Sequence, residues 1–368
     1  MYRFLSIVWY KIYPPEFGGQ KGIACFNASL SKIYPVDVLC ASSNVASKDS
    51  ECNILPNLPV SKWQFINPVV WYKIQKQIIK HPYTHLIIEH PYYGFIGALY
   101  KNKKRKFILH AHNIEAKRFK KLNKWWWFLL GAYEKWSMQK ADLVLFKTQS
   151  DKKYAIKNYK LEARKTYVLE YGIIPNTLNK PECRQKLIET YRLDSEISLL
   201  VFAGTLDYQP NANAVEFIYN ELEPLLNSKL HKPFKIIICG RNNEKRYAYL
   251  KQLENKNIIQ AGYVDDIDCY IAGADVFINP VKDVFGVQTK TMDAVALGQN
   301  VVIFPESASE LPSYLIEKKV FIANDSHEYV SKIIIALETN SQTPQEFFND
   351  YGWDHIVHKF VKHLQQSK

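Results

Sequence analysis

The chain has 368 residues, of which 47% are apolar and 23% charged, and its formal net charge is +12. This balance excludes a disordered chain, and the length exceeds one ordinary core, so we expect two domains. The charge implies attraction to anions, whether phosphorylated small molecules, anionic lipid or nucleic acid. Six cysteines without a CxxC pair exclude a zinc ribbon or a disulfide framework and indicate a reducing cytoplasm.

The N-terminal apolar run is too short for a signal peptide, and no stretch has the length of a membrane-spanning helix. Any membrane contact is therefore expected to be peripheral, at the inner face.

Short apolar runs alternate with longer helical patterns along the whole chain, which predicts an α/β fold of parallel sheets with crossover helices. In the first half we expect strands at 2–9, 36–42, 84–90, 106–112, 141–148 and 166–172, and helices at 18–33 and 67–80. In the second half we expect strands at 198–204, 234–240, 257–264, 274–281 and 300–305. These patterns predict two doubly wound domains, joined within the polar stretch from Ile174 to Ser198. The tail from Thr343 has a helical period with an interruption near Gly352.

In open parallel sheets, ligands bind beyond the carboxyl ends of the strands. After the first strand, Gly18 and Gly19 would let the backbone approach a ligand at a helix start, although a tight turn explains paired glycines equally well. In "HAHNIE", His112 follows a strand together with Asn113 and Glu115. A lone histidine at such a position is either functional or a satisfied structural residue.

Two loops of the second half carry further candidates. In "FAGTLDYQPNANAVEF", Gly204 and Thr205 end a strand, and Asn211 or Asn213 would cap the next helix. In the second loop, Gly286 precedes a helix expected at 288–297, and Gly298 stands where a left-handed helix end belongs. A glycine loop at a helix start is a natural anion site, to which Lys290 adds a cation and Asp293 an acceptor for sugar hydroxyls.

Three segments in this order, "FAGTLDYQPNANAV", "AGYVDDIDCYIAGADVFINPV" and "GVQTKTMDAVALGQNVV", resemble the donor-binding half of retaining glycosyltransferase family four. The "FGG" and "HNIE" segments resemble its acceptor half. The resemblance spans nearly the whole chain and implies the glycosyltransferase B fold, with two Rossmann-like domains facing across a cleft. It implies an acceptor domain at 1–174, a donor domain at 190–345 and a C-terminal helix at 346–368 that crosses back to the first domain.

The resemblance also implies roles for individual residues. The stretch from Gly262 to Asp266, with Tyr263 and Val264, would hold the nucleotide base through its backbone. The diphosphate would be held by Gly286, Val287, Gln288, Thr289 and Lys290. Asp293 would bind the ribose, His112 would lie near the transferred sugar, and Gly18 and Gly19 would lie near the phosphates and the acceptor.

Some positions depart from the family pattern. Phe285 stands where many relatives carry a second glutamate, and Thr205 and Pro210 stand where an arginine and a lysine grip the diphosphate. A departing diphosphate needs positive charge. We therefore expect Lys290, with help from Lys282 or Arg241, to take the place of the missing arginine and lysine.

The implied reaction moves a sugar, with retained configuration, from a nucleotide-diphosphate donor to a hydroxyl of a glycolipid or polysaccharide in bacterial surface polysaccharide synthesis. The resemblance implies that no cofactor or metal is needed, because in enzymes of this fold helix N–H groups and cations do the work of a metal. A separate zinc site is not expected, because the spacings of His81, His85, His90, His110 and His112 match no familiar zinc ligand set. One alternative is a nucleotide-sugar 2-epimerase of the same fold. Another is a non-catalytic basic protein that binds membrane or nucleic acid, suggested by "KNKKRK" at 101–106, although no nucleic-acid recognition module is visible.

The stretch "KRFKKLNKWWWFLL" at 117–130 sets lysines beside tryptophans, as a membrane-surface helix does. On an assumed helix one stripe would be core, formed by Leu122, Trp126, Leu129, Tyr133 and Trp136. The opposite face would offer candidate membrane contacts at Lys120, Lys121, Lys124, Trp127 and Phe128. Alternatively, the helix begins only near Asn123, and a neighbouring segment covers Trp127.

Overall fold

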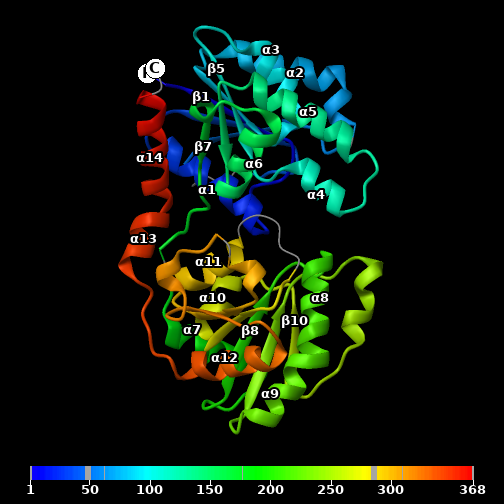
Figure 1. Ribbon diagram of the computed structural model, residues 1–368, viewed down its shortest axis with the longest axis vertical. Helices are drawn as coiled ribbons and strands as arrows, with labels where there is room; N and C mark the ends of the chain where they lie inside the picture. The colour runs from blue at the N-terminus through cyan, green and yellow to red at the C-terminus, as the bar shows by residue number, and fades with distance from the viewer. Residues whose placement is uncertain are drawn as a thin grey trace. The chain divides into compact units, whose positions relative to one another are not determined.

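The computed structural model describes residues 2–45, 51–61, 63–175, 177–282, 288–308 and 310–366. The chain forms two compact units, of which the first comprises Met1–Gly172 with Trp353–Lys368 and the second Ile173–Gly352. The chain thus passes between units at Gly172 and again at Gly352, whereas the sequence suggested boundaries at 174 and 345. Each unit is a parallel sheet flanked by helices (Figure 1).

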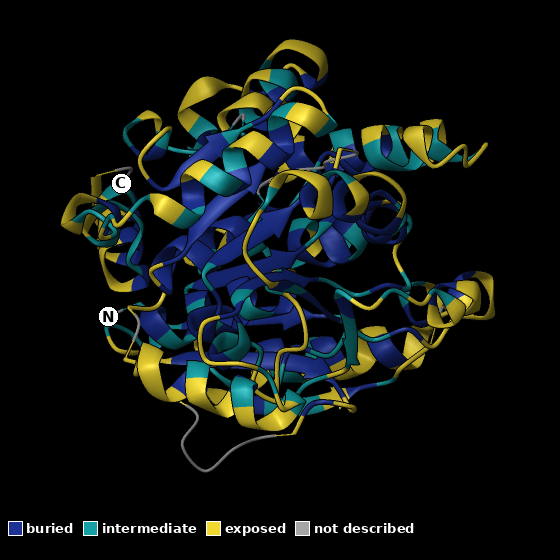
Figure 2. Cartoon of the chain, turned by 90° about the horizontal axis from the view of Figure 1, so that it is seen from below, coloured by how far each residue is buried: buried dark blue, intermediate teal, exposed yellow. Residues whose placement is uncertain are grey.

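The sheet of the first unit has the strand order β3-β2-β1-β4-β5-β6-β7, and all neighbours pair in parallel. Its strands are β1 (Phe4–Val8), β2 (Val36–Ala41), β3 (Asn53–Leu58), β4 (His85–Glu89), β5 (Lys106–Ala111), β6 (Leu143–Phe146) and β7 (Thr166–Val168). Most of these strands are buried throughout, because helices cover both faces of a parallel sheet (Figure 2).

The helices of the first unit lie on the two faces of this sheet. They are α1 (Gly18–Ser31), α2 (Pro68–Lys80), α3 (Gly94–Tyr100), α4 (Glu115–Lys121), α5 (Trp127–Lys140), α6 (Gln149–Tyr159) and α14 (Trp353–Gln366). Residues of α2, α3, α5 and α6 share one core cluster with the strands, whereas α1 packs against α14, with Phe26 against Phe360. The C-terminal helix α14 is therefore part of the first unit.

Helix α2 shows how the sequence specifies one of these elements. The side chain of Asn67 accepts a hydrogen bond from the Val69 N–H, and Pro68 occupies the first helical turn. Val70, Ile74 and Ile78 follow at intervals of four residues and are the buried positions of the helix.

The second unit has the strand order β10-β9-β8-β11-β12-β13, again with all neighbours parallel. Its strands are β8 (Ser198–Ala203), β9 (Phe234–Cys239), β10 (Ile258–Gly262), β11 (Val276–Asn279), β12 (Asn300–Ile303) and β13 (Val320–Ile322). Its helices are α7 (Lys180–Tyr191), α8 (Gln209–Phe217), α9 (Glu223–Lys229), α10 (Ile267–Gly273), α11 (Thr289–Ala296), α12 (Ser326–Glu338) and α13 (Gln345–Tyr351). A π-helical turn, Ile218–Leu222, joins α8 to α9.

Three sequence expectations about these elements need correction. Strands β3 and β13 were missed, because β3 contains Pro56 and β13 is only three residues long. The stretch expected as a polar linker contains the helix α7, which packs tightly on α10. A side chain at Gly273 of α10 would meet the backbone of Cys183 at 2.8 Å, so only glycine permits this approach.

The tryptophan-rich stretch does not form one continuous helix. Asn123 adopts a left-handed backbone (φ 52°) between the end of α4 and the start of α5. The expected core stripe is therefore wrong, since Leu122, Leu129 and Trp136 are exposed. The buried positions of α5 are instead Glu134, Ser137 and Met138.

The aromatic residues of this stretch differ in burial. Trp125 is 74% exposed and Phe128 is 50% exposed, whereas Trp127 packs partly buried against the core of the first unit. The Lys120 ammonium lies over the Trp127 ring, 4.8 Å from its centroid. In the part of the chain that the structure describes, no helix is both long and apolar enough to cross a bilayer.

Candidate functional site

The strand orders locate the functional edge of each sheet. In both sheets the order reverses beside the first strand, between β1 and β4 in the first unit and between β8 and β11 in the second. Ligands of such sheets bind beyond the carboxyl ends of the strands at this reversal. The candidate residues of each unit lie at these ends.

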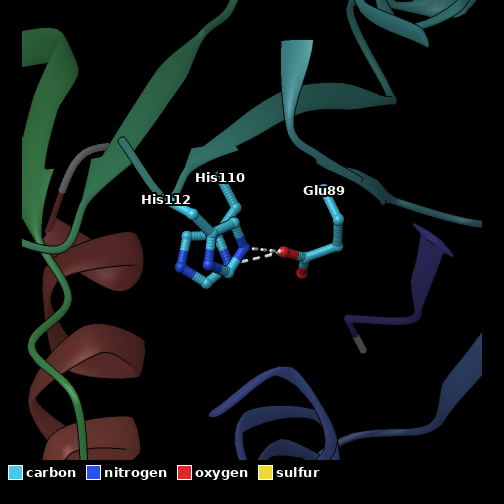
Figure 3. Close-up of side chains that lie close together, drawn as sticks. All are labelled: Glu89, His110 and His112. Carbon is cyan, nitrogen blue, oxygen red and sulfur yellow. Dashed lines mark hydrogen bonds and ion pairs between the residues drawn. The ribbon is translucent and has the colours of Figure 1, made fainter. Parts of the chain in front are cut away.

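In the first unit, Glu89 ends β4 and pairs in register with His110 of β5. Its carboxylate Oε2 lies 2.6 Å from His112 Nε2 and 2.9 Å from His110 Nδ1 (Figure 3). The Glu89 and His110 side chains are fully buried, and that of His112 is 10% exposed. Glu89 thus fixes the orientation of the ring of His112, the histidine that we identified as a candidate from the sequence.

Charge in this cluster is set by burial and by the contacts within it. Burial opposes ionisation of Glu89, but the two histidines outweigh it and hold the Glu89 pKa far below its usual range. Burial lowers the pKa of His110 to about 4 and lowers that of His112 well below its ordinary value. The cluster therefore holds an ionised carboxylate and two neutral imidazoles near pH 7.

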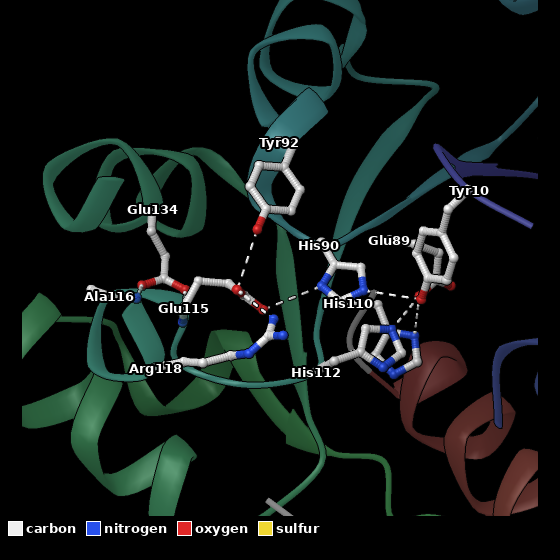
Figure 4. A network of polar contacts seen from close by, with 10 residues as sticks. All are labelled: Tyr10, Glu89, His90, Tyr92, His110, His112, Glu115, Ala116, Arg118 and Glu134. Carbon is white, nitrogen blue, oxygen red and sulfur yellow. Dashed lines mark hydrogen bonds and ion pairs between the residues drawn. The ribbon is translucent and has the colours of Figure 1, made fainter. Parts of the chain in front are cut away.

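A second polar network adjoins this cluster (Figure 4). The His90 ring stacks on His112 at a centroid distance of 4.5 Å, and its Nε2 lies 3.2 Å from the Tyr10 hydroxyl. His90 Nδ1 lies 3.5 Å from Glu115 Oε1, and Arg118 donates to the other oxygen of Glu115. This network links the ends of β1, β4 and β5 to the start of α4.

Glu134 of α5 holds the start of α4 in place. Its carboxylate accepts hydrogen bonds from the backbone N–H groups of Glu115 and Ala116 and from the Tyr159 hydroxyl. Burial raises the pKa of Glu134 to about 7, although these three donors favour the ionised form. The group therefore serves the structure by satisfying the first N–H groups of α4.

Lys147 directly follows β6 at the same edge of the sheet. Its ammonium is buried, and it has no hydrogen-bond acceptor among the residues described. Burial lowers its pKa to about 8, against the attraction of Glu89 and Glu170. The ammonium also lies 5.7 Å from the centroid of the Trp353 ring at the start of α14.

In the second unit, the loops after β8, β9 and β10 are held together through their backbones. The Gly204 N–H donates to the Cys239 carbonyl, and the Gly240 N–H donates to the Gly262 carbonyl. A side chain at Gly240 would collide with the Gly204 carbonyl, at 1.9 Å. These contacts bring the candidate residues Gly204, Thr205 and Gly262 to one end of the sheet.

The Lys290 side chain, from the first turn of α11, extends to this end of the sheet. Its Nζ donates to Asn211 Oδ1 at 2.8 Å and lies over the Phe202 ring, while Asn211 Nδ2 donates to the Thr205 carbonyl at 2.8 Å. Asn211 lies inside α8 and neither it nor Asn213 caps that helix, so the capping expectation is wrong. Burial lowers the Lys290 pKa below its ordinary value.

Other candidate residues of the second unit surround this centre. Arg241 pairs with Asp207 at 3.6 Å, and Tyr263 is exposed directly after the left-handed Gly262 (φ 68°). The partly exposed candidates are Val264, Gln288, Thr289 and Asp293. Lys282 lies over the Phe304 ring. Phe285, Gly286 and Val287 lie outside the residues that the structure describes.

The helix expected at 288–297 is confirmed as α11, Thr289–Ala296, and Gly298 is left-handed as expected (φ 84°). In the first unit, Gly18 and Gly19 form the first turn of α1, as the sequence suggested.

Sequence reasoning missed Glu89, Lys147 and the hydrogen bonds by which Asn211 joins Lys290 to the Thr205 carbonyl. A charged residue at the end of each otherwise apolar strand run, "HLIIE" and "LVLFK", was the available signal. Burying such a charge is costly unless it is paired, so its presence at a strand end marks a site worth examining.

Comparisons with known proteins agree with this arrangement. Residues 30–176 match the family model "Glycosyltransferase Family 4", and residues 198–339 match the family model "Glycosyl transferases group 1". A comparison with curated protein sequences gave no match.

Solved structures of the same fold cover nearly the whole chain. Anabaena HepE, in complex with UDP and glucose, is 16% identical, with 99% of this chain and 100% of that chain covered at a TM-score of 0.74. Sucrose-phosphate synthase from Thermosynechococcus elongatus is 13% identical, with 99% and 98% covered at a TM-score of 0.74. WaaG, a glycosyltransferase involved in lipopolysaccharide biosynthesis, is 14% identical, with 97% and 95% covered at a TM-score of 0.65.

The two family matches together take in most of the chain, with one match mostly in the first unit and the other within the second. The chain therefore belongs to the group 1 glycosyltransferases, with a Glycosyltransferase Family 4 domain before the group 1 domain, and has the glycosyltransferase B fold.

Proposed function

We propose that the protein transfers a sugar, with retained anomeric configuration, from a nucleotide-diphosphate donor to a hydroxyl of a glycolipid or polysaccharide acceptor. One observation carries the donor half of this proposal. Lys290 places a cation in the first turn of α11, and Asn211 links it to the Thr205 carbonyl after β8. A helix start with an adjacent cation favours a diphosphate, because free N–H groups and positive charge converge there.

Apart from the Lys290 ammonium and nearby backbone N–H groups, few groups are needed to hold the donor. Asn211 holds Lys290 through one side-chain atom and the Thr205 carbonyl through another, so the lysine is oriented before a ligand arrives. The partly exposed carboxylate of Asp293, one turn further along α11, suits hydrogen bonds from ribose hydroxyls. The presence of UDP and glucose in the HepE complex supports a nucleotide-sugar donor here.

In the first unit, His112 is our candidate contact to the transferred sugar. Glu89 accepts from His112 Nε2 at 2.6 Å, which fixes the tautomer with the proton on Nε2 and leaves Nδ1 as an acceptor. A neutral imidazole oriented in this way accepts a hydrogen bond from a sugar hydroxyl. We assign Glu89 the role of positioning residue, since it acts through His112.

We further propose that the first unit docks on an anionic membrane surface, where a glycolipid acceptor resides. Trp125, just before α5, and Phe128 and Leu129 in its first turn are exposed, and Lys121 at the end of α4 and Lys124 lie shortly before them in the chain. Aromatic rings beside lysines suit the headgroup region of an anionic bilayer. The role of WaaG in lipopolysaccharide biosynthesis supports an acceptor of the surface-polysaccharide class.

The donor reaction can be tested without knowing the acceptor. The full chain is incubated with a panel of nucleotide sugars, with and without a lipid extract, and nucleoside diphosphate release is measured. Proton NMR then shows the configuration of the transferred or released sugar, which we expect to be that of the donor. Inverted configuration would refute the retaining mechanism, and a new epimer formed from donor alone would show a 2-epimerase.

A further inference from the structure

Glu89, His110 and His112 also form a set of metal-ligating side chains. We propose that this cluster binds a divalent transition metal ion, and that the bound metal blocks His112 and so inhibits sugar transfer. The inhibition half of this inference rests on the proposed function, whereas the binding half does not. The metal here is an inhibitor and not a cofactor.

Strand geometry brings the three side chains together. His110 and His112 stand two residues apart at the end of β5, so their rings project from the same face of the sheet. Glu89 is the registered neighbour of His110 on β4. One possible ligand atom from each of the three side chains lies within 4.8 Å of the other two, and the side chains converge (Figure 3).

The distances require only a small opening of the cluster. In tetrahedral coordination with metal–ligand bonds of about 2.0–2.1 Å, neighbouring ligand atoms lie about 3.3 Å apart. The carboxylate oxygen now lies 2.6 Å from one imidazole nitrogen and 2.9 Å from the other. Each ligating nitrogen would offer its lone pair to the metal, so each neutral imidazole would carry its proton on its other ring nitrogen. Glu89 Oε1 has no hydrogen-bond partner among the described residues and is free to join the coordination.

The ligand types select the metal. Two imidazole nitrogens and one carboxylate oxygen suit Zn²⁺, Co²⁺ or Ni²⁺, whereas Mg²⁺ prefers oxygen ligands and retains its waters. A fourth position would be left for water, as in zinc sites with three protein ligands.

The positive charge of Lys147 should weaken metal binding, which provides a further test of the site. Lys147 is buried at the end of β6 and interacts electrostatically with both Glu89 and His110. A cation in this place weakens binding of a second cation. Replacing it with an uncharged side chain of similar length, in Lys147→Met, should therefore tighten metal binding.

The consequence for the transferase follows from the atoms involved. The metal would take His112 Nε2 and Glu89 Oε2, which are the two atoms that now orient the imidazole. With the metal on Nε2, the neutral His112 imidazole carries its proton on Nδ1, which can then no longer accept a hydrogen bond from a sugar hydroxyl. We therefore expect Zn²⁺ to inhibit and Mg²⁺ to have no such effect.

The binding test uses the full chain and Zn²⁺ or Co²⁺ alone, with isothermal titration calorimetry and the visible absorption of bound Co²⁺. We expect one site in the wild type, at least about 10-fold weaker binding in His110→Asn and Glu89→Gln, and tighter binding in Lys147→Met. His231→Asn, which changes an exposed histidine of the second unit, is the matched control and should bind like the wild type.

Equal affinity in the wild type and His110→Asn would place the metal elsewhere, for instance on cysteines, and would overturn the inference. Binding no tighter than about 1 mM in the wild type would do the same.

Inhibition of sugar transfer is measured separately from metal binding. A protein that transfers sugar but is not inhibited by Zn²⁺ at saturating occupancy would refute the inhibition. A protein that binds Zn²⁺ but releases no nucleotide from any donor would refute the proposed function and leave the metal site standing.

Discussion

Replacing Lys290 with methionine tests the donor site most sharply. The substitution keeps most of the side-chain volume but removes the ammonium that lies 2.8 Å from Asn211 Oδ1. If that ammonium also contacts the diphosphate, the variant loses a charge-assisted hydrogen bond, which contributes about 1.5–3 kcal/mol. Because the lysine side chain is partly exposed, we expect the lower part of this range, or a donor Kd raised about 10- to 50-fold.

The same change should affect folding only slightly. Loss of the lysine leaves Asn211 Oδ1 without this partner, which costs about 1 kcal/mol. Burial lowers the Lys290 pKa, so the charged form is itself disfavoured in the fold, and its removal offsets part of that cost. We expect the melting temperature to change by less than about 4 °C.

The assay is calorimetric titration with a nucleotide-sugar donor that the wild type binds. Lys235→Met is the matched control, because it removes the same charge near the amino end of β9, at the opposite edge of the sheet. Donor affinity that is unchanged in Lys290→Met, or that falls equally in Lys235→Met, would refute the assignment of Lys290 to the diphosphate.

Three further predictions concern the first unit. Glu89→Gln should lower kcat on the order of 100-fold through misplacement of His112, with donor Kd unchanged, and an unaltered kcat would contradict the positioning role. Lys147, with a pKa of about 8 in the fold and 10.5 unfolded, should contribute about 2 kcal/mol to the rise in unfolding free energy from pH 7.5 to 9.5; urea unfolding of Lys147→Met should lack this contribution. Trp125→Ser with Phe128→Ser should weaken binding to anionic liposomes about 30-fold, whereas Ile335→Ser of the second unit should not; equal losses would exclude this surface.

The sign of the pH effect follows from proton binding. Between pH 8 and 10.5 the unfolded chain keeps a proton on Lys147 that the folded chain has lost, so stability rises with pH through this window. Lys319, whose pKa burial also lowers to about 8, contributes a parallel rise that remains in Lys147→Met. The prediction is therefore a smaller slope in the variant, not a flat profile.

The alternation of apolar runs and helical periods was enough to predict two parallel α/β units, because buried parallel strands such as β4 are continuous apolar segments. Hydrophobic periodicity gave a wrong prediction where the local backbone conformation interrupts a helix. A left-handed Asn123 splits the tryptophan-rich stretch, so the single helical wheel placed Leu129 on the wrong side. The alternative, a helix that begins only near Asn123 with Trp127 covered by a neighbouring segment, is closer to the structure, in which α5 begins at Trp127 and this side chain is partly buried.

Some residues of the candidate site could likewise be predicted from the sequence, and others could not. His112 and Lys290 were found because each stands in a segment with a recognisable order of residues. Glu89 lies on a different strand from His112, 23 residues earlier in the chain, and the two meet only through the β4–β5 pairing. Contacts of this kind depend on strand register, which a single sequence does not reveal.

One titration shows whether this glycosyltransferase binds a nucleotide-sugar donor through its second unit, as we propose. The wild-type chain is titrated in a calorimeter with UDP-, GDP-, ADP- and dTDP-sugars. We expect saturable binding of at least one donor, and weaker binding of that donor by Lys290→Met but not by Glu89→Gln. Absence of binding across the whole panel would contradict this proposal.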